Sequence, residues 1–380
     1  MRVFEELINQ ERIISILVEA ITASKDNENS TQGMTHAWLF TGPPGSGRSN
    51  AALAFAAGLV CKNNGCNECT DCKTAIRGSH ADVELIATEG LSIKIGEIRE
   101  LITRASWSPS VGNYRVVVIE DADRLTESAA SALLKAIEEP GLRTVWLLCA
   151  PSTTDVLPTI RSRTRSLVLR TPSTSAVAAL LERENISPKM AEFAARASQG
   201  HIGRARYLAL NGDARSRREA ILKISLLITD VASAFKAAQV LVEAAKTEAE
   251  EDAEKRDGVE LASLKEAWGQ QGSKLTQGGS KAVKELEKEQ KSRTTRMVRD
   301  YLDRALLDIA TLYRDILLVQ SNSHDSIING DLLGEITELA SKTTPEATLR
   351  KLESIMSARN NLSHNAAPLL TIEALMVSLK

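Results

Sequence analysis

A glycine-rich turn near residue 45 constrains this fold more than any other feature of the sequence. It reads GPPGSGRS at 42–49, follows the apolar segment AWLFTG, and precedes a long Ala-rich segment that begins at Ser49. The apolar segment is typical of a buried strand and the Ala-rich segment of a helix. Backbone N–H groups can close on phosphate oxygens at such a turn because glycine permits the close approach. We therefore predict an α/β unit built around a phosphate-binding loop.

The loop departs from the usual pattern at one position. The pattern is Gly, four residues, Gly, Lys, then Ser or Thr, and Arg48 stands in place of the lysine. Lysine is a compact point charge, whereas guanidinium is planar and bulkier. ATP with Mg²⁺ is therefore a possible but weak ligand, and the alternative is a loop that keeps the fold and binds nothing. The candidate nucleotide contacts in this loop are Gly42, Gly45, Gly47, Arg48 and Ser49.

Strands and helices alternate through the first part of the chain. Strands are expected at 80–86, 116–119, 144–150 and 166–170, and helices at 94–106 and 128–139. Such alternation predicts a parallel sheet with helices on both faces. After Arg170 the pattern changes to helices without clear strands.

The strand at 116–119 leads into two acidic residues. In AAA+ ATPases such a strand ends in an Asp that holds magnesium, followed by a Glu that activates the attacking water. Here the order is reversed, with Glu120 before Asp121. A misplacement of about 1 Å can lower a rate on the order of 100-fold. This second departure predicts poor hydrolysis.

Four cysteines fall within a short segment: Cys61, Cys66, Cys69 and Cys72. Four thiolates so close together suit a tetrahedral structural zinc site. The alternatives are a redox-active pair or free thiols. The fifth cysteine, Cys149, lies in an apolar strand and is predicted to be part of the core.

Length and composition limit the remaining possibilities. A chain of 380 residues predicts two or three domains, and no apolar run is long enough for a membrane span. The polar first residues predict no signal peptide, and hence a cytoplasmic protein. A net charge of -2 provides no global attraction to nucleic acid, so any DNA contact must be local. An aromatic content of 3% argues against base stacking as a main activity.

Two later segments stand out. Residues 246–292 are rich in Glu, Lys, Gln and Gly and predict a solvated, partly helical insertion. From Val298 to Val319, apolar residues recur in alternating steps of four and three. This spacing predicts one apolar helix face, which we assign to a bundle core rather than to a coiled-coil partner.

These motifs occur in a familiar order. THAWLFTGPPGSGRS, the cysteine cluster, VVVIEDADRLTESAASALLKAIEEP and Ser162-Arg163 resemble the AAA+ clamp-loader subunits of bacterial DNA polymerase III. The C-terminal HNAAPLLTIEALMVSL resembles the last collar helix of that family. The resemblance implies an AAA+ module at 1–170, a helical lid at 171–211 and an all-α collar at 212–380 that includes the charged insertion.

The same resemblance implies further site residues. Arg163 matches an arginine finger that reaches the ATP of a neighbouring subunit, although Thr164 departs from the family's third motif position. The sensor 1 position falls near Ser152. The position of the sensor 2 arginine holds Gly203 instead.

The family pattern predicts a stator subunit that lends Arg163 to a neighbour and hydrolyses little ATP alone. Its implied partners are the gamma or tau and delta subunits, the sliding clamp and primer–template DNA, in the cytoplasmic replisome. No polymerase chemistry is expected, because no set of two-metal carboxylates is seen. The alternatives are a gamma- or tau-type ATPase, an AAA+ DNA repair helper, and a scaffold.

Overall fold

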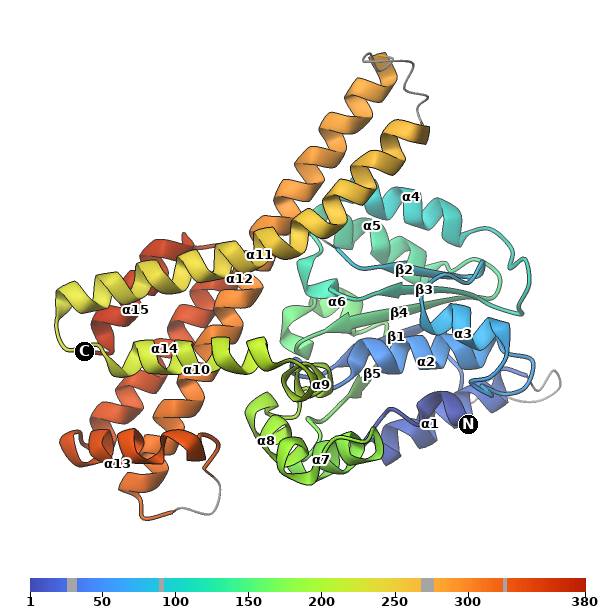
Figure 1. The fold of residues 1–380 in the computed structure, drawn as a ribbon. Coiled ribbons are helices and arrows are strands. Elements are labelled where there is room, and N and C mark those ends of the chain that lie inside the picture. Colours follow the sequence, from blue (N-terminus) through green and yellow to red (C-terminus); the bar gives the residue numbers. More distant parts are fainter. Residues whose placement is uncertain (26–32, 89–91, 268–276, 324–326) are drawn as a thin grey trace. The chain divides into compact units, whose positions relative to one another are not determined.

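The computed structural model describes residues 1–25, 33–88, 92–267, 277–323 and 327–380 (Figure 1). It divides into two compact units, Met1–Arg206 and Tyr207–Lys380. Among the described residues, no helix is both long enough and apolar enough to cross a membrane.

The first unit is built on a five-stranded parallel sheet in the order β2-β3-β4-β1-β5. The strands are β1 (Ala37–Thr41), β2 (Val83–Ile86), β3 (Arg115–Ile119), β4 (Thr144–Ala150) and β5 (Arg165–Val168). The register of β1 on β4 runs from Ala37 opposite Trp146 to Thr41 opposite Ala150. The segments that follow these strands therefore leave the sheet at one common edge.

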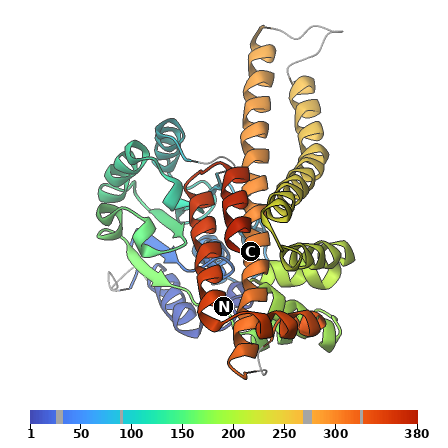
Figure 2. The same ribbon diagram turned by 90° about the vertical axis from the view of Figure 1, so that its left-hand side faces the viewer.

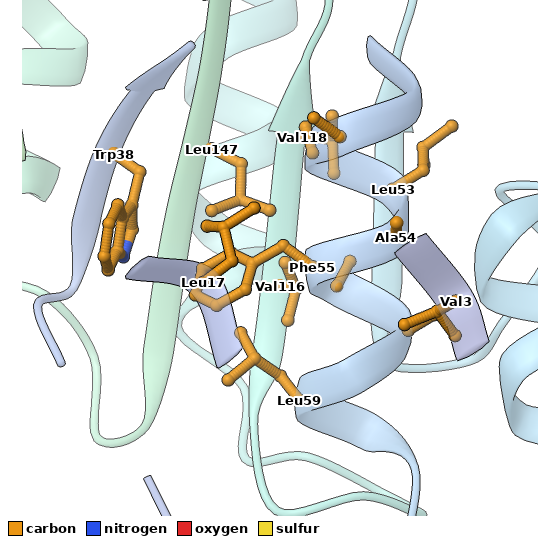
Figure 3. Packing of buried hydrophobic residues seen from close by; sticks show 14 of the residues in the cluster. Val3, Leu17, Trp38, Leu53, Ala54, Phe55, Leu59, Val116, Val118 and Leu147 are labelled. Atoms are coloured by element: carbon orange, nitrogen blue, oxygen red, sulfur yellow. The ribbon is translucent and has the colours of Figure 1, made fainter. Parts of the chain in front are cut away.

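Side chains alternate between the two faces of the sheet along each strand, and helices bury both faces. Figure 3 shows Phe55 of α2 beside Leu17 of α1 and the strand residues Val116 and Leu147. The other face carries the alternate residues, such as Trp146. The first face is covered by η1 (Arg2–Phe4), α1 (Glu11–Ala23) and α2 (Arg48–Val60), and the second by α4 (Ile95–Ala105), α5 (Glu127–Glu138) and α6 (Pro158–Arg161).

The α/β class with helices on both faces is confirmed. The expected strand at 80–86 is shorter than predicted, because the residues before Val83 form a polar turn. The backbone N–H of Asp82 donates to Nδ1 of His80 at 3.0 Å. Its carboxylate accepts three backbone N–H groups, those of residues 110–112, at 2.6 to 2.7 Å. Asp82 thus ties the loop before β3 to the start of β2.

Shorter elements complete this unit. They are α3 (Thr70–Ile76), η2 (Ala122–Arg124), η3 (Thr153–Asp155), α7 (Thr174–Arg183) and α8 (Pro188–Ser198), with α9 (Ile202–Leu210) at the boundary. After β5 the described residues form helices only, as the change of pattern at Arg170 predicted.

The second unit is helical. Its elements are α10 (Gly212–Leu226), α11 (Val231–Ala267), α12 (Gln277–Gln320), η4 (Gly330–Leu332), α13 (Leu333–Lys342), α14 (Pro345–Ser363) and α15 (Pro368–Ser378). The periodic positions on α12 face its core: Leu302, Ile309, Leu312 and Ile316 are at most 1% exposed. Val298 and Val319 pack at the edge of the same cluster. The prediction of a bundle core is confirmed.

The charged segment 246–292 is more regular than predicted. Its described residues continue α11 to Ala267 and form the start of α12 from Gln277, while 268–276 lie outside the described residues. Figures 1 and 2 show this helix pair extending beyond the shorter helices of the second unit. Arg293 of α12 donates to Glu260 of α11 at 2.8 Å and is 7% exposed. Paired charges between the two helices explain how so polar a segment stays helical.

A buried polar cluster joins three parts of the helical unit. Arg218 of α10 pairs with Asp308 of α12 at 2.9 Å, and both side chains are 4% exposed. The same guanidinium donates to Oδ1 of Asn329 at 2.6 Å. Asn329 in turn donates from its backbone and its amide to Asp315, at 2.8 Å each. The cluster fixes the chain before η4 against α10 and α12.

Candidate functional site

The phosphate loop connects β1 to α2 as the sequence predicted. Gly45 has a φ of 86°, and Gly47, the N-cap of α2, has a φ of 83°. Side chains rarely adopt this left-handed region, so glycine is required at both positions. The first turn of α2 therefore has the backbone conformation that the motif implied.

The loop is nevertheless packed against other segments of the same unit. A Cβ atom on Gly45 would lie 2.6 Å from Cα of His201, and one on Gly47 would lie 3.6 Å from Cδ2 of Leu7. The turn at Gly200, whose φ is 88°, brings His201 to this position. No local pattern predicts this contact, because His201 lies more than 150 residues from the loop.

The side chain of Arg48 is directed back to the loop. Its Nη1 donates to the carbonyl oxygen of Gly42 at 2.7 Å. The cation therefore bonds to the first residue of its own motif. The Arg48 guanidinium thus satisfies a backbone carbonyl of the loop and is not extended toward a ligand.

The acidic pair after β3 lies at the same sheet edge. The acidic pair lies close to Cys149 of β4. Burial has the largest effect on the pKa of the Cys149 thiol and raises it, and the carboxylates of Glu120 and Asp121 raise it further. The charge of Arg48 lowers the same pKa. The same thiol interacts with the Ser49 side chain. These four candidate residues from α2 and the end of β3 thus surround one buried strand position. Cys149 itself is a core residue, as predicted.

A third carboxyl group lies beside the candidate pair. Burial, followed by the charge of Asp121, raises the pKa of Asp123, and Arg48 partly offsets this effect. Carboxyl groups are thus concentrated at this edge, together with two cations: Arg48, and Arg124, whose Nε lies 3.9 Å from Oδ2 of Asp121. The sequence reasoning did not single out Asp123, although it stands within VVVIEDAD.

The two sensor positions do not supply a charged group. The Ser152 hydroxyl, after β4, accepts the backbone N–H of Thr154 at 3.1 Å and caps η3. Gly203 lies on α9, and a Cβ atom there would be 3.4 Å from Cε1 of His201. The next residue, Arg204, donates its backbone N–H to Nδ1 of the same histidine at 3.2 Å.

The four clustered cysteines converge from the end of α2, the following loop and α3. Their sulfur atoms all lie within 4.8 Å of one another. Cys61 Sγ is 3.8 Å from that of Cys66 and 3.7 Å from that of Cys69. Tetrahedral zinc with Zn–S bonds of about 2.3 Å requires sulfur separations of about 3.8 Å. The cluster therefore fits a four-thiolate metal site.

Backbone geometry holds these thiols in place. The Cys69 N–H donates to the sulfur of Cys66, and the Cys72 N–H donates to that of Cys69, at 3.4 Å each. Gly65, with a φ of 68°, provides the turn between Cys61 and Cys66. Lys25 donates to the carbonyl oxygen of Cys61 at 2.6 Å. A lysine beside thiolates offsets part of their negative charge.

The thiols differ in their acidity. Backbone hydrogen bonds from Glu68 and Cys69 lower the pKa of Cys66 to about 6. Burial raises the pKa of Cys72. The lowered pKa of Cys66 favours its thiolate, the form that binds metal.

Arg163 lies between α6 and β5 at the surface of the first unit. Its side chain is 42% exposed, and its Nε pairs with Oε1 of Glu138 at 2.5 Å. Nη1 donates to the carbonyl oxygen of Thr159 at 3.1 Å. The neighbouring arginines have other roles: Arg165 stacks on Trp38 at 4.9 Å, and Arg161 donates to the carbonyl of Thr153.

Comparison with known proteins matches both parts of the chain. The family model for the DNA polymerase III delta subunit matches residues 18–173, and the model for the C-terminal part of that subunit matches residues 300–379. A Bacillus subtilis DNA polymerase III subunit delta' is 25% identical over 94% of this chain and 92% of its own length.

Two further relatives match a smaller share of the chain. A Pseudomonas aeruginosa DNA polymerase III subunit delta' is 35% identical over 34% of this chain and 41% of its own length. A Mycobacterium tuberculosis DNA polymerase III subunit gamma/tau is 31% identical over 47% of this chain and 31% of its own length. Since family models match the α/β unit and the C-terminal helices alike, the chain belongs to the DNA polymerase III delta-subunit family of clamp-loader proteins.

Proposed function

We propose that this chain is the stator, delta-prime-type subunit of a replicative clamp loader. In this role it assembles with gamma or tau motor subunits and a delta subunit, and the assembly places a sliding clamp on primer–template DNA. The chain itself hydrolyses little or no ATP and carries out no polymerase chemistry. It contributes an arginine to the ATP site of a neighbouring motor subunit.

The weak nucleotide site of the chain supports this role. Arg48 replaces the motif lysine and bonds to the carbonyl of Gly42. His201 lies against Gly45, and Gly203 stands where the family has a sensor arginine. Each feature removes or occupies a group that would stabilise the charge of a transferred phosphoryl group.

The exposed guanidinium of Arg163 is the observation that carries the proposal. It lies at the surface, whereas the loop cation Arg48 is turned inward. A guanidinium at a subunit boundary can stabilise developing charge on a neighbour's γ-phosphate. The stator thus provides a charge that acts in trans while its own site stays inactive.

We further propose that the cysteine cluster binds a structural zinc ion through Cys61, Cys66, Cys69 and Cys72. When bound, the zinc closes a loop that has little core of its own. Two N–H···S bonds and the turn at Gly65 hold the four thiols close together for the metal.

Exposed apolar side chains on the helical unit support a role in assembly. Five large apolar side chains on α14 and α15 are 37% to 67% exposed: Leu349, Met356, Leu369, Leu370 and Val377. Apolar side chains grouped on a surface favour burial against another protein. We assign these side chains to contacts with other clamp-loader subunits.

The finger role is tested by Arg163→Ala in a loader reconstituted with gamma or tau and delta. Removing such a finger lowers hydrolysis at the affected site on the order of 1,000-fold. The DNA-stimulated rate of ATP hydrolysis should therefore fall by the fraction that this one site contributes, while the subunits still assemble. Arg161→Ala is the matched control. Unchanged turnover in the Arg163 variant would contradict the proposal.

A titration of the purified chain with ATP separates the alternatives. Weak binding without turnover supports a stator. Turnover comparable to that of the assembled loader would instead favour a gamma- or tau-type ATPase. Failure to co-purify with other loader subunits would favour a DNA repair helper.

A further inference from the structure

The motif ALLKAIEEP ends beside the proposed finger. Its first glutamate, Glu138, is the last residue of α5, and its Oε1 accepts the Arg163 Nε at 2.5 Å. The two residues are 25 positions apart and belong to two separate motifs of the sequence. Packing of α6 on α5 brings them together. The function proposed above does not explain this glutamate.

The pair does little for stability. The two side chains are 42% and 46% exposed, and ion pairs at this exposure contribute little to folding. The contact does restrict direction, because a planar guanidinium bonded at Nε has few orientations left. Two more bonds, from Nη1 to the Thr159 carbonyl and to the Ser162 hydroxyl, act on the same side chain.

These three bonds use two of the three guanidinium nitrogens. They engage Nε and Nη1. Among the described residues these bonds do not involve Nη2, which can therefore donate to a ligand. An arginine ordered before its partner arrives loses less conformational freedom when it meets phosphate oxygens. Glu138 supplies the only charged group among these three partners.

We propose that Glu138 is a positioning residue, which orients Arg163 toward the ATP of the neighbouring subunit. This inference rests on the proposed finger role of Arg163. Ordering one long side chain corresponds to roughly a 3- to 10-fold change in rate. Glu138→Ala should therefore lower hydrolysis at the affected inter-subunit site about 3- to 10-fold, through kcat and with little change in KM for ATP.

The test uses the reconstituted loader with its full chains. Glu138→Gln keeps an oxygen acceptor and should restore much of the rate, whereas Glu139→Ala, at the exposed next residue, should have no effect. In an Arg163→Ala background, Glu138→Ala should cause no additional loss. An equal loss in that background, or a normal kcat for the single variant, would overturn the proposal.

A second measurement separates this inference from the finger role. In nitrogen-labelled arginine spectra of the purified chain, Glu138→Ala should shift and broaden the Arg163 Nε–H signal. If that signal is unchanged, the positioning contact is absent and the inference fails. If the signal changes but Arg163→Ala leaves turnover intact, the finger role itself is wrong, and Glu138 then positions nothing for catalysis.

Discussion

Asp82→Asn should destabilise the α/β unit through the loop before β3. In the wild-type chain, Oδ1 of Asp82 accepts the N–H of Ser110, and Oδ2 accepts those of Val111 and Gly112. Asparagine has a single side-chain oxygen, so at least one N–H loses its acceptor and faces an amide NH₂ instead. The side chain is fully buried, which prevents water from replacing the lost bond.

The magnitude follows from these bonds. A hydrogen bond to a charged group contributes about 1.5–3 kcal/mol, and the remaining bonds become neutral and weaker. We expect the free energy of unfolding to fall by about 2–4 kcal/mol at pH 7. Urea unfolding followed by tryptophan fluorescence measures this unit, because Trp38 and Trp146 are buried in its core. The exposed Asp155→Asn is the control.

The effect should also depend on pH. Burial alone would raise the pKa of Asp82, but the three backbone N–H donors outweigh it and hold the pKa below its usual value of 3.8. A carboxyl group with a lower pKa in the folded state stabilises the fold above about pH 3.8, and this stabilisation is lost as the pH falls through the folded pKa. The difference between wild type and Asp82→Asn should therefore shrink below pH 3.8. A loss under 0.5 kcal/mol at pH 7, roughly that of a neutral surface change, would refute this reasoning.

Three further outcomes are expected. Cys72→Ser should abolish stoichiometric zinc in metal analysis, whereas Cys149→Ala should retain it; equal zinc contents would exclude a four-cysteine site. Gly45→Ala should lower stability by about 1–3 kcal/mol in urea because of its positive φ and its contact with His201, while Gly96→Ala, with open space around it, should not; similar midpoints would argue against the packed loop. Arg218→Ala should cost about 3–5 kcal/mol by removing the buried cation that pairs with Asp308, and hydrogen exchange along α12 should speed up; unchanged protection would contradict a structural role for the pair.

Local patterns in the sequence predicted much of the first unit. The glycine turn, the β-branched run at 116–119 and the apolar segment at 144–150 each specify an element through short-range preferences. The cysteine cluster is equally predictable, because its four cysteines lie in one short segment. The extent of the helices at 246–292 was underestimated, since side-chain pairs between two helices, such as Arg293 with Glu260, are not visible in composition.

The sequence by itself determined the order of strands and helices, the phosphate-loop turn, the cysteine cluster and the apolar face of α12, because each depends on residues close together in the chain. Only the tertiary structure decided that His201 lies on Gly45, that Arg48 bonds to Gly42, and that Glu138 holds Arg163. These contacts depend on side-chain direction and on how helices pack on the sheet. Both are fixed by the whole core rather than by any local pattern.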